Sequence, residues 1–158
     1  MNLFSIKMRL LVLLGTGLLA MSCASTEKLL VKQFTLRNEQ TDPKENLMLR
    51  MEKQEKLFGA VSMQERKQRL GQYYTMLWND ASGVGTAPVR VVFLYQQAQS
   101  TNRIKRMEQT FSAATPSGKA EFAVRGDDYF KRGRVLAWKA TLYRGQEELA
   151  SQQSYLWQ

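Results

Sequence analysis

From Gly71 onward, apolar and polar residues alternate with a period of two, and turn signals recur about every ten residues. Alternation of this kind places successive side chains on opposite faces of a strand, as in a half-buried sheet. Strands are expected at 29–37, 73–78, 89–95, 103–111, 120–124, 134–143 and 147–157. In 134–143, one face is expected to carry Leu136, Trp138, Ala140 and Leu142. About seven strands without alternating helices predict an all-β antiparallel sandwich.

A helical pattern follows the first expected strand, over about residues 44–69. One helical face, spaced i, i+4, i+7 and i+11, carries Leu47, Met51, Gln54 and Phe58. Ser62 and Glu65 fit a capping box, which predicts a second short helix through about Arg69. The sandwich is therefore expected to hold a short helical insertion after its first strand.

The first 23 residues combine a charged start, an apolar run and a cysteine. Lys7 and Arg9 precede an apolar run at 10–20, which is too short to span a bilayer but suits a signal peptide. Ala20-Met-Ser-Cys23 then resembles a lipobox, and Cys23 is the single cysteine of the chain. The expected organisation is a signal peptide at 1–22, a lipidated N-terminus with a short tether at 23–27, and a folded domain at 28–158.

Export determines the size and charge of the mature chain. Removing residues 1–22 from the 158-residue chain leaves 136 residues, enough for one domain with its own core. The net charge falls from +9 to +7 because Lys7 and Arg9 leave with the signal. Ala24, directly after the lipidated cysteine, predicts attachment to the cell outer membrane, with the domain on the periplasmic face.

The residues that are missing exclude several kinds of active site. The chain has no histidine and Cys23 is expected to carry lipid, which excludes disulfides, histidine-based nucleophile systems and ordinary zinc or copper sites. Carboxylate chemistry remains, with Asp127 beside Asp128, and Asp80 and Glu121 elsewhere. We favour a turn feeding a strand at 126–129, and expect a non-enzymatic protein with no catalytic residue, metal or cofactor.

Short motifs follow one another along almost the whole mature chain. They are Gly71-Gln-Tyr-Tyr-Thr75, Trp78, Pro88-Val-Arg-Val91, Tyr95-Gln-Gln-Ala98, Gly126-Asp-Asp-Tyr129, Gly133-Arg-Val135, Trp138 and Ser154-Tyr-Leu-Trp157. In this order they resemble immunoglobulin-like lipoproteins of Verrucomicrobia-type bacteria. The resemblance implies an immunoglobulin-like sandwich in the cell envelope, and some such envelope proteins are linked to type IV pilus machinery. It implies no activity, and this chain lacks the cysteine pair of antibody domains.

The aromatic residues divide into structural and interaction candidates. Trp78 and Trp138 lie in alternating strands and are expected in the core. Tyr129 resembles the tyrosine corner of sandwich folds, whose hydroxyl ties down a connection. Trp157 either closes the core or lies on an exposed edge where a partner could add a strand.

Two functions remain open. The first is a non-catalytic interaction or assembly module of the envelope, accessory to a pilus or secretion machine, which binds an envelope protein through a sheet edge or the insertion. Its candidate contact residues are Phe58 and Trp157. The alternative is a module for an anionic envelope polymer, namely lipopolysaccharide, peptidoglycan or acidic glycan, with candidate contacts Lys53, Lys56, Arg66 and Arg69. Only the second predicts binding that falls steeply with salt, and the lack of interleaved aromatic residues argues against nucleic acid.

Overall fold

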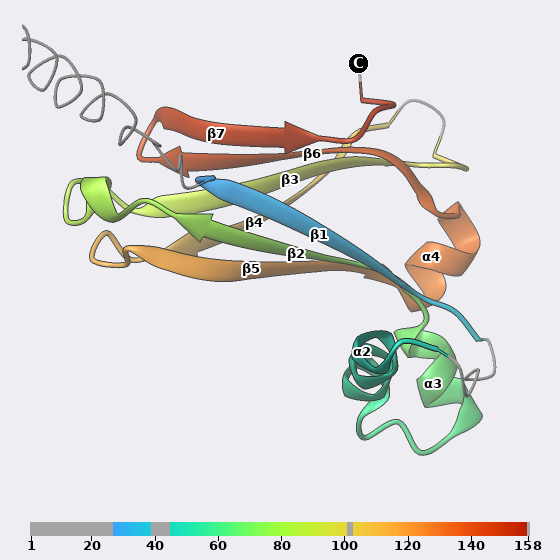
Figure 1. Cartoon of the computed structure of the whole chain (residues 1–158). Coiled ribbons are helices and arrows are strands. Elements are labelled where there is room, and N and C mark those ends of the chain that lie inside the picture. The colour runs from blue at the N-terminus through green and yellow to red at the C-terminus, as the bar shows by residue number, and fades with distance from the viewer. Residues whose placement is uncertain (1–26, 39–44, 101–102, 158) are drawn as a thin grey trace, which may run out of the picture.

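The computed structural model describes residues 27–38, 45–100 and 103–157, and in these ranges seven strands form two antiparallel sheets. The three-stranded sheet has the order β1-β2-β5, with β1 at Leu29–Leu36, β2 at Gly71–Asn79 and β5 at Ser117–Arg125. The four-stranded sheet has the order β4-β3-β6-β7, with β4 at Lys105–Phe111, β3 at Val89–Gln97, β6 at Val135–Arg144 and β7 at Glu147–Gln153. The two sheets form the two layers in Figure 1. The predicted all-β sandwich is confirmed.

The core lies between the sheets, where the alternating side chains of β2 meet those of β3. Phe93 is at its centre, with its ring centroid 4.6 Å from that of Tyr74 and 5.6 Å from that of Phe122. Trp78 is 3% exposed, and the half-buried Trp138 packs against the same cluster. Both tryptophans are therefore core residues, as predicted.

The prediction that Leu136 shares one face of its strand with Trp138, Ala140 and Leu142 is wrong, at the start of β6. Leu136 is 40% exposed, whereas Ala140 and Leu142 are fully buried. The pairing with β3 is irregular there, because Gln96 lies opposite Ala137 while the next residue, Gln97, lies opposite Val135. The extra residue, Leu136, is left out of the alternation, as at a β-bulge.

The insertion contains two helices, α2 at Leu47–Leu57 and α3 at Met63–Arg69. The Asn46 side chain accepts a hydrogen bond from Met48 N at the start of α2. The predicted capping box at the start of α3 is confirmed: Glu65 N donates to the Ser62 hydroxyl, and Ser62 N donates to the Glu65 carboxylate. Among the described residues, no helix is both long and apolar enough to cross a membrane.

The predicted turn at 126–129 is wrong, because this segment is part of a short helix, α4 (Gly126–Arg132). The distribution of charge favours the helix, because acidic residues occupy its first turn and basic residues its last, which suits the helix dipole. At the junction between β5 and α4, Gly126 has a φ of +57°, a conformation that glycine adopts readily. Tyr129 therefore lies on a helix, and its half-buried ring packs against the core cluster.

The sandwich has two unlike ends, which Figure 1 shows on opposite sides of the sheets. The turn end contains a 3-10 turn, η2 (Ala81–Gly83), and the connections β4–β5 and β6–β7. The helical end contains α2, α3 and α4. Strand β1 links them, since Leu29 pairs with Trp78 at the turn end and Leu36 pairs with Gly71 at the helical end.

Candidate interaction surface

Helix α2 exposes most of its apolar side chains, whereas its two lysines are half-buried. The side chains of Lys53 and Lys56 are only 18% and 14% exposed. An apolar stripe at helical spacing ordinarily faces a core, but here neither α2 nor α3 contains a buried residue. We call the exposed apolar side chains of the insertion the apolar helical surface: Leu47, Met48, Leu49, Met51, Phe58, Val61 and Met63.

The inward charges of α2 are satisfied by ion pairs. Lys53 Nζ lies 2.6 Å from a carboxylate oxygen of Glu45, and Lys56 Nζ lies 3.3 Å from one of Glu52. Lys56 also approaches Glu121 of β5 at 3.8 Å, which joins the helix to the sheet. Partial burial opposes the charged form of Lys56, but the carboxylates of Glu52, Glu121 and Glu55 together raise the pKa of Lys56 above its ordinary value.

The two arginine candidates of the insertion also make internal contacts. Arg66 Nε donates to the carbonyl of Ala60, at 3.4 Å, and an Arg69 guanidinium nitrogen donates to the carbonyl of Lys56, at 3.2 Å. These bonds stabilise the segment that joins α2 to α3. All four predicted polyanion contacts are thus engaged in holding the insertion together, although Arg66 remains exposed.

A hollow of about 420 Å³ extends the apolar helical surface toward α4. It is lined by Asn38, Met63, Gln64, Arg66, Lys67, Leu70 and Phe130. Phe130 is 45% exposed, and the Lys67 ammonium lies 5.4 Å from the centre of its ring. Apolar and cationic groups therefore meet in this hollow.

Glutamine side chains bridge the two places where the sheets meet at their edges. The Gln109 amide on β4 donates to the carbonyl of Glu121 on β5, at 2.8 Å, and accepts from Glu121 N, at 3.3 Å. On the other side, Val31 N of β1 donates to the Gln152 side-chain oxygen of β7, at 2.7 Å. A partner strand added at Glu121 or Val31 would have to break these bonds.

Trp157 follows β7, next to the second of these edges. Its side chain is half-buried, and its backbone N donates to the carbonyl of Ser154, at 3.0 Å. Its neighbours Tyr155 and Leu156 are 99% and 60% exposed. The two predicted contact residues belong to different parts of the fold, since Phe58 ends α2 and Trp157 follows β7.

The adjacent carboxylates of α4 are paired with cations. Asp127 accepts from Gln68 and Lys131, and these two groups lower its pKa. Partial burial disfavours the charged form of Asp128, but bonds from Lys105, at 2.9 Å, and Arg132, at 2.6 Å, lower its pKa below the ordinary value. A general acid at neutral pH needs a raised pKa, so this pair does not favour acid–base hydrolysis.

The predicted lipidation residue, Cys23, lies outside the described residues. Within the described ranges, no group of three or more acidic, cysteine or histidine side chains is arranged to hold a metal ion. Comparison of the chain with protein-family models, curated proteins and solved structures gives no match.

Proposed function

We propose that the protein is a membrane-anchored periplasmic lipoprotein that acts as a non-catalytic interaction module of the cell envelope, and that the apolar helical surface binds its protein partner. The observation that carries this proposal is the inverted orientation of α2. Phe58, Val61 and Met48 are 84%, 87% and 74% exposed, whereas the side chains of Lys53 and Lys56 on α2 are only 18% and 14% exposed. A group of exposed apolar side chains within one short insertion indicates an interaction site.

The position of this surface keeps it out of reach of the chain's own lipidated N-terminus. Strand β1 begins at the turn end, where Leu29 pairs with Trp78, whereas α2 and α3 lie at the helical end. The eight residues of β1 span about 24 Å. Residues 23–28 reach at most about 20 Å when fully extended. The mature N-terminus is thus too short to fold back along β1 and cover the surface.

The chemistry of the surface indicates what the partner presents. Apolar side chains dominate it, and the adjoining hollow adds the cations Arg66 and Lys67. A complementary partner presents an apolar patch with acidic groups at its rim. The bridged sheet edges favour the helices over strand addition as the recognition mode.

The resemblance to envelope lipoproteins enters here as part of the proposal. Strands one, two and five share one sheet, and strands three, four, six and seven share the other. This division supports an immunoglobulin-like sandwich, in which the A and B strands face C, F and G. We propose that the partner belongs to a multi-protein machine such as a pilus or secretion system.

Site-specific photocrosslinking of the full-length chain in cells tests the proposed function. A photoreactive phenylalanine analogue is placed at Met48 or Phe58, with Val84, 43% exposed beside η2, as the matched control. We expect one defined envelope protein to crosslink at Met48 and Phe58 but not at Val84. A second substitution, Val61→Asp, should abolish the crosslink, whereas Cys23→Ser should weaken it by releasing the anchor.

Four outcomes would contradict the proposal. Crosslinks to lipid alone would make the apolar helical surface a membrane contact. Equal crosslinking at Val84, or crosslinks that persist with Val61→Asp, would show that the surface is not the contact. Capture that depends on Lys53 and Arg69 and is lost in high salt would favour the polyanion alternative.

A further inference from the structure

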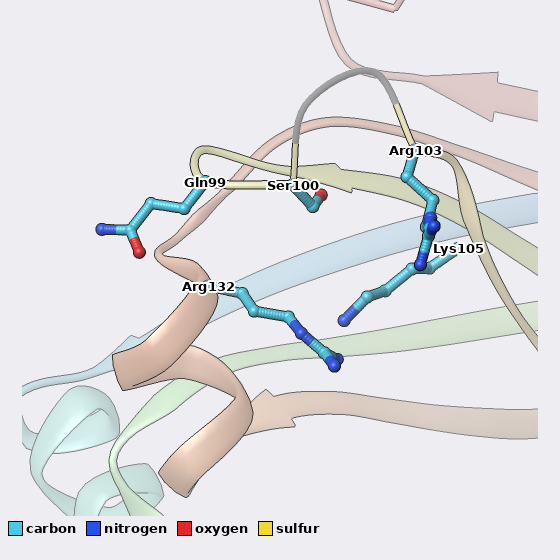
Figure 2. A pocket seen from close by; sticks show the side chains of 5 residues that line it. All are labelled: Gln99, Ser100, Arg103, Lys105 and Arg132. Carbon is cyan, nitrogen blue, oxygen red and sulfur yellow. The ribbon is translucent and has the colours of Figure 1, made fainter.

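A basic pocket of about 370 Å³ lies between α4 and the connection from β3 to β4. It is lined by Gln99, Ser100, Arg103, Lys105 and Arg132. Figure 2 shows Lys105 and Arg132 approaching from opposite sides with their charged ends close together, and Arg103 descending beside Lys105. Three of the five lining residues are therefore cations.

The charges of this pocket are incompletely balanced. Lys105 and Arg132 both donate to the same carboxylate oxygen of Asp128, at 2.9 Å and 2.6 Å. One carboxylate thus serves two cations, and the exposed Arg103 adds a third positive charge. An anion that enters the pocket gains Coulomb energy from this excess of positive charge.

The base of the pocket is held in place by a buried glutamine. Gln97 is 4% exposed, and its side-chain amide donates to the carbonyls of Asp128, at 3.2 Å, and Gly133, at 3.0 Å. Its side-chain oxygen accepts from Lys105 Nζ, at 2.6 Å. Lys105 and Arg132 are consequently fixed before a ligand arrives, which reduces the conformational entropy lost on binding.

We propose that this pocket binds a phosphate monoester group, with Lys105 and Arg132 at its base and Arg103 at its side. Two guanidinium groups can each give parallel hydrogen bonds to phosphate oxygens, a geometry that a lone ammonium does not offer. The phosphate can come from a phosphorylated sugar or from a lipid headgroup. This site is separate from the apolar helical surface, and its failure would leave the proposed function intact.

Titration calorimetry of the full-length chain in detergent at constant ionic strength tests the site. Inorganic phosphate is the first ligand, followed by glucose 1-phosphate and by a soluble short-chain phosphatidate to distinguish a sugar source from a lipid source. We expect saturable phosphate binding that Arg103→Ala weakens about fivefold, as expected for loss of one solvent-exposed ion pair. Arg103→Lys should restore part of the affinity.

The matched control is Arg106→Ala, which removes the same charge three residues further along the chain, on β4. Arg106 is exposed, paired with Glu108 and absent from the pocket lining. We expect it to bind phosphate as the unsubstituted chain does, with all variants melting at the same temperature. Equal losses with Arg103→Ala and Arg106→Ala, or equal affinity for acetate and phosphate, would overturn the assignment.

Discussion

The turn end and the helical end of the sandwich use charged side chains in opposite ways. At the turn end, Arg144 and Asp80 are 6% and 4% exposed and form a buried ion pair. At the helical end, Lys53 and Lys56 are only half-buried, and apolar side chains of the same insertion face solvent. At the turn end, the buried charges hold the connections of the fold together. At the helical end, the lysines occupy the inner side of a helix and leave its apolar side free for a partner.

The buried pair of the turn end joins several connections. Arg144 donates to Asp80 through Nε and to the carbonyls of Ala87, at 2.8 Å, and Ala113, at 3.3 Å. Asp80 N in turn donates to the carbonyl of Pro116, at 2.8 Å. One arginine thereby holds the segment after η2 and the β4–β5 connection against the end of β6.

The largest effect is therefore expected from Arg144→Met. This change leaves the Asp80 carboxylate buried without its main partner and should lower the free energy of unfolding by about 3–5 kcal/mol. Urea unfolding measures the loss. The control is Lys119→Met, which removes an exposed lysine from its pair with Glu121 and should cost less than about 1 kcal/mol. Similar losses of stability in the two variants would show that the buried ion pair of the turn end contributes no more than an exposed one.

An intermediate effect is expected at the helical end from Ser62→Ala. The substitution removes the hydroxyl that accepts from Glu65 N and should lower stability by about 1 kcal/mol. Hydrogen exchange should localise this loss to the α3 amides and leave the β2 and β3 amides protected. Ser151→Ala, on exposed β7, is the control. Uniformly faster exchange across the sheets would show that the two ends unfold together.

Local patterns predicted the elements well, because each depends on nearby residues. Alternation indicated the strands, and Ser62 with Glu65 indicated the start of α3. Alternation failed at Leu136 because a bulge depends on the register with the neighbouring strand. The prediction of a turn at 126–129 is wrong because it gave no weight to the charge pattern. Two acidic residues, Asp127 and Asp128, are followed by two basic residues, Lys131 and Arg132, which suit the two ends of a short helix.

The features that hold the turn end together and form the candidate binding sites depend on distant pairings that no local pattern shows. Asp80 and Arg144 are 64 residues apart, and Lys105 meets Asp128 across 23 residues. Spacing placed Leu47, Met51 and Phe58 on one face, but only the fold shows that this face is exposed. Only the antiparallel order of the sheets brings Arg132 beside Lys105.

The smallest effect on stability is expected from substitution of Asp128 at the helical end, and it depends on acidic pH. Its folded-state pKa lies below the unfolded value of about 3.9 because Lys105 and Arg132 stabilise the charged form, even though partial burial opposes it. Its contribution to stability is therefore complete above about pH 4 and is lost as the pH falls through the folded pKa. Asp128→Asn should remove less than about 1 kcal/mol at pH 7 and make unfolding less dependent on pH below about 4. Chemical unfolding across this range measures both quantities.

The control for this prediction is Asp127→Asn, the same chemical change one residue earlier on α4. Asp127 is more exposed than Asp128, and its partners are Gln68 and Lys131 at the surface. Solvent screens its pairing more strongly, so its substitution should change the pH dependence less than Asp128→Asn does. If Asp127→Asn had the larger effect, the acid response of α4 would arise at its exposed surface. The network that fixes Lys105 and Arg132 would then contribute little to the stability of the helical end.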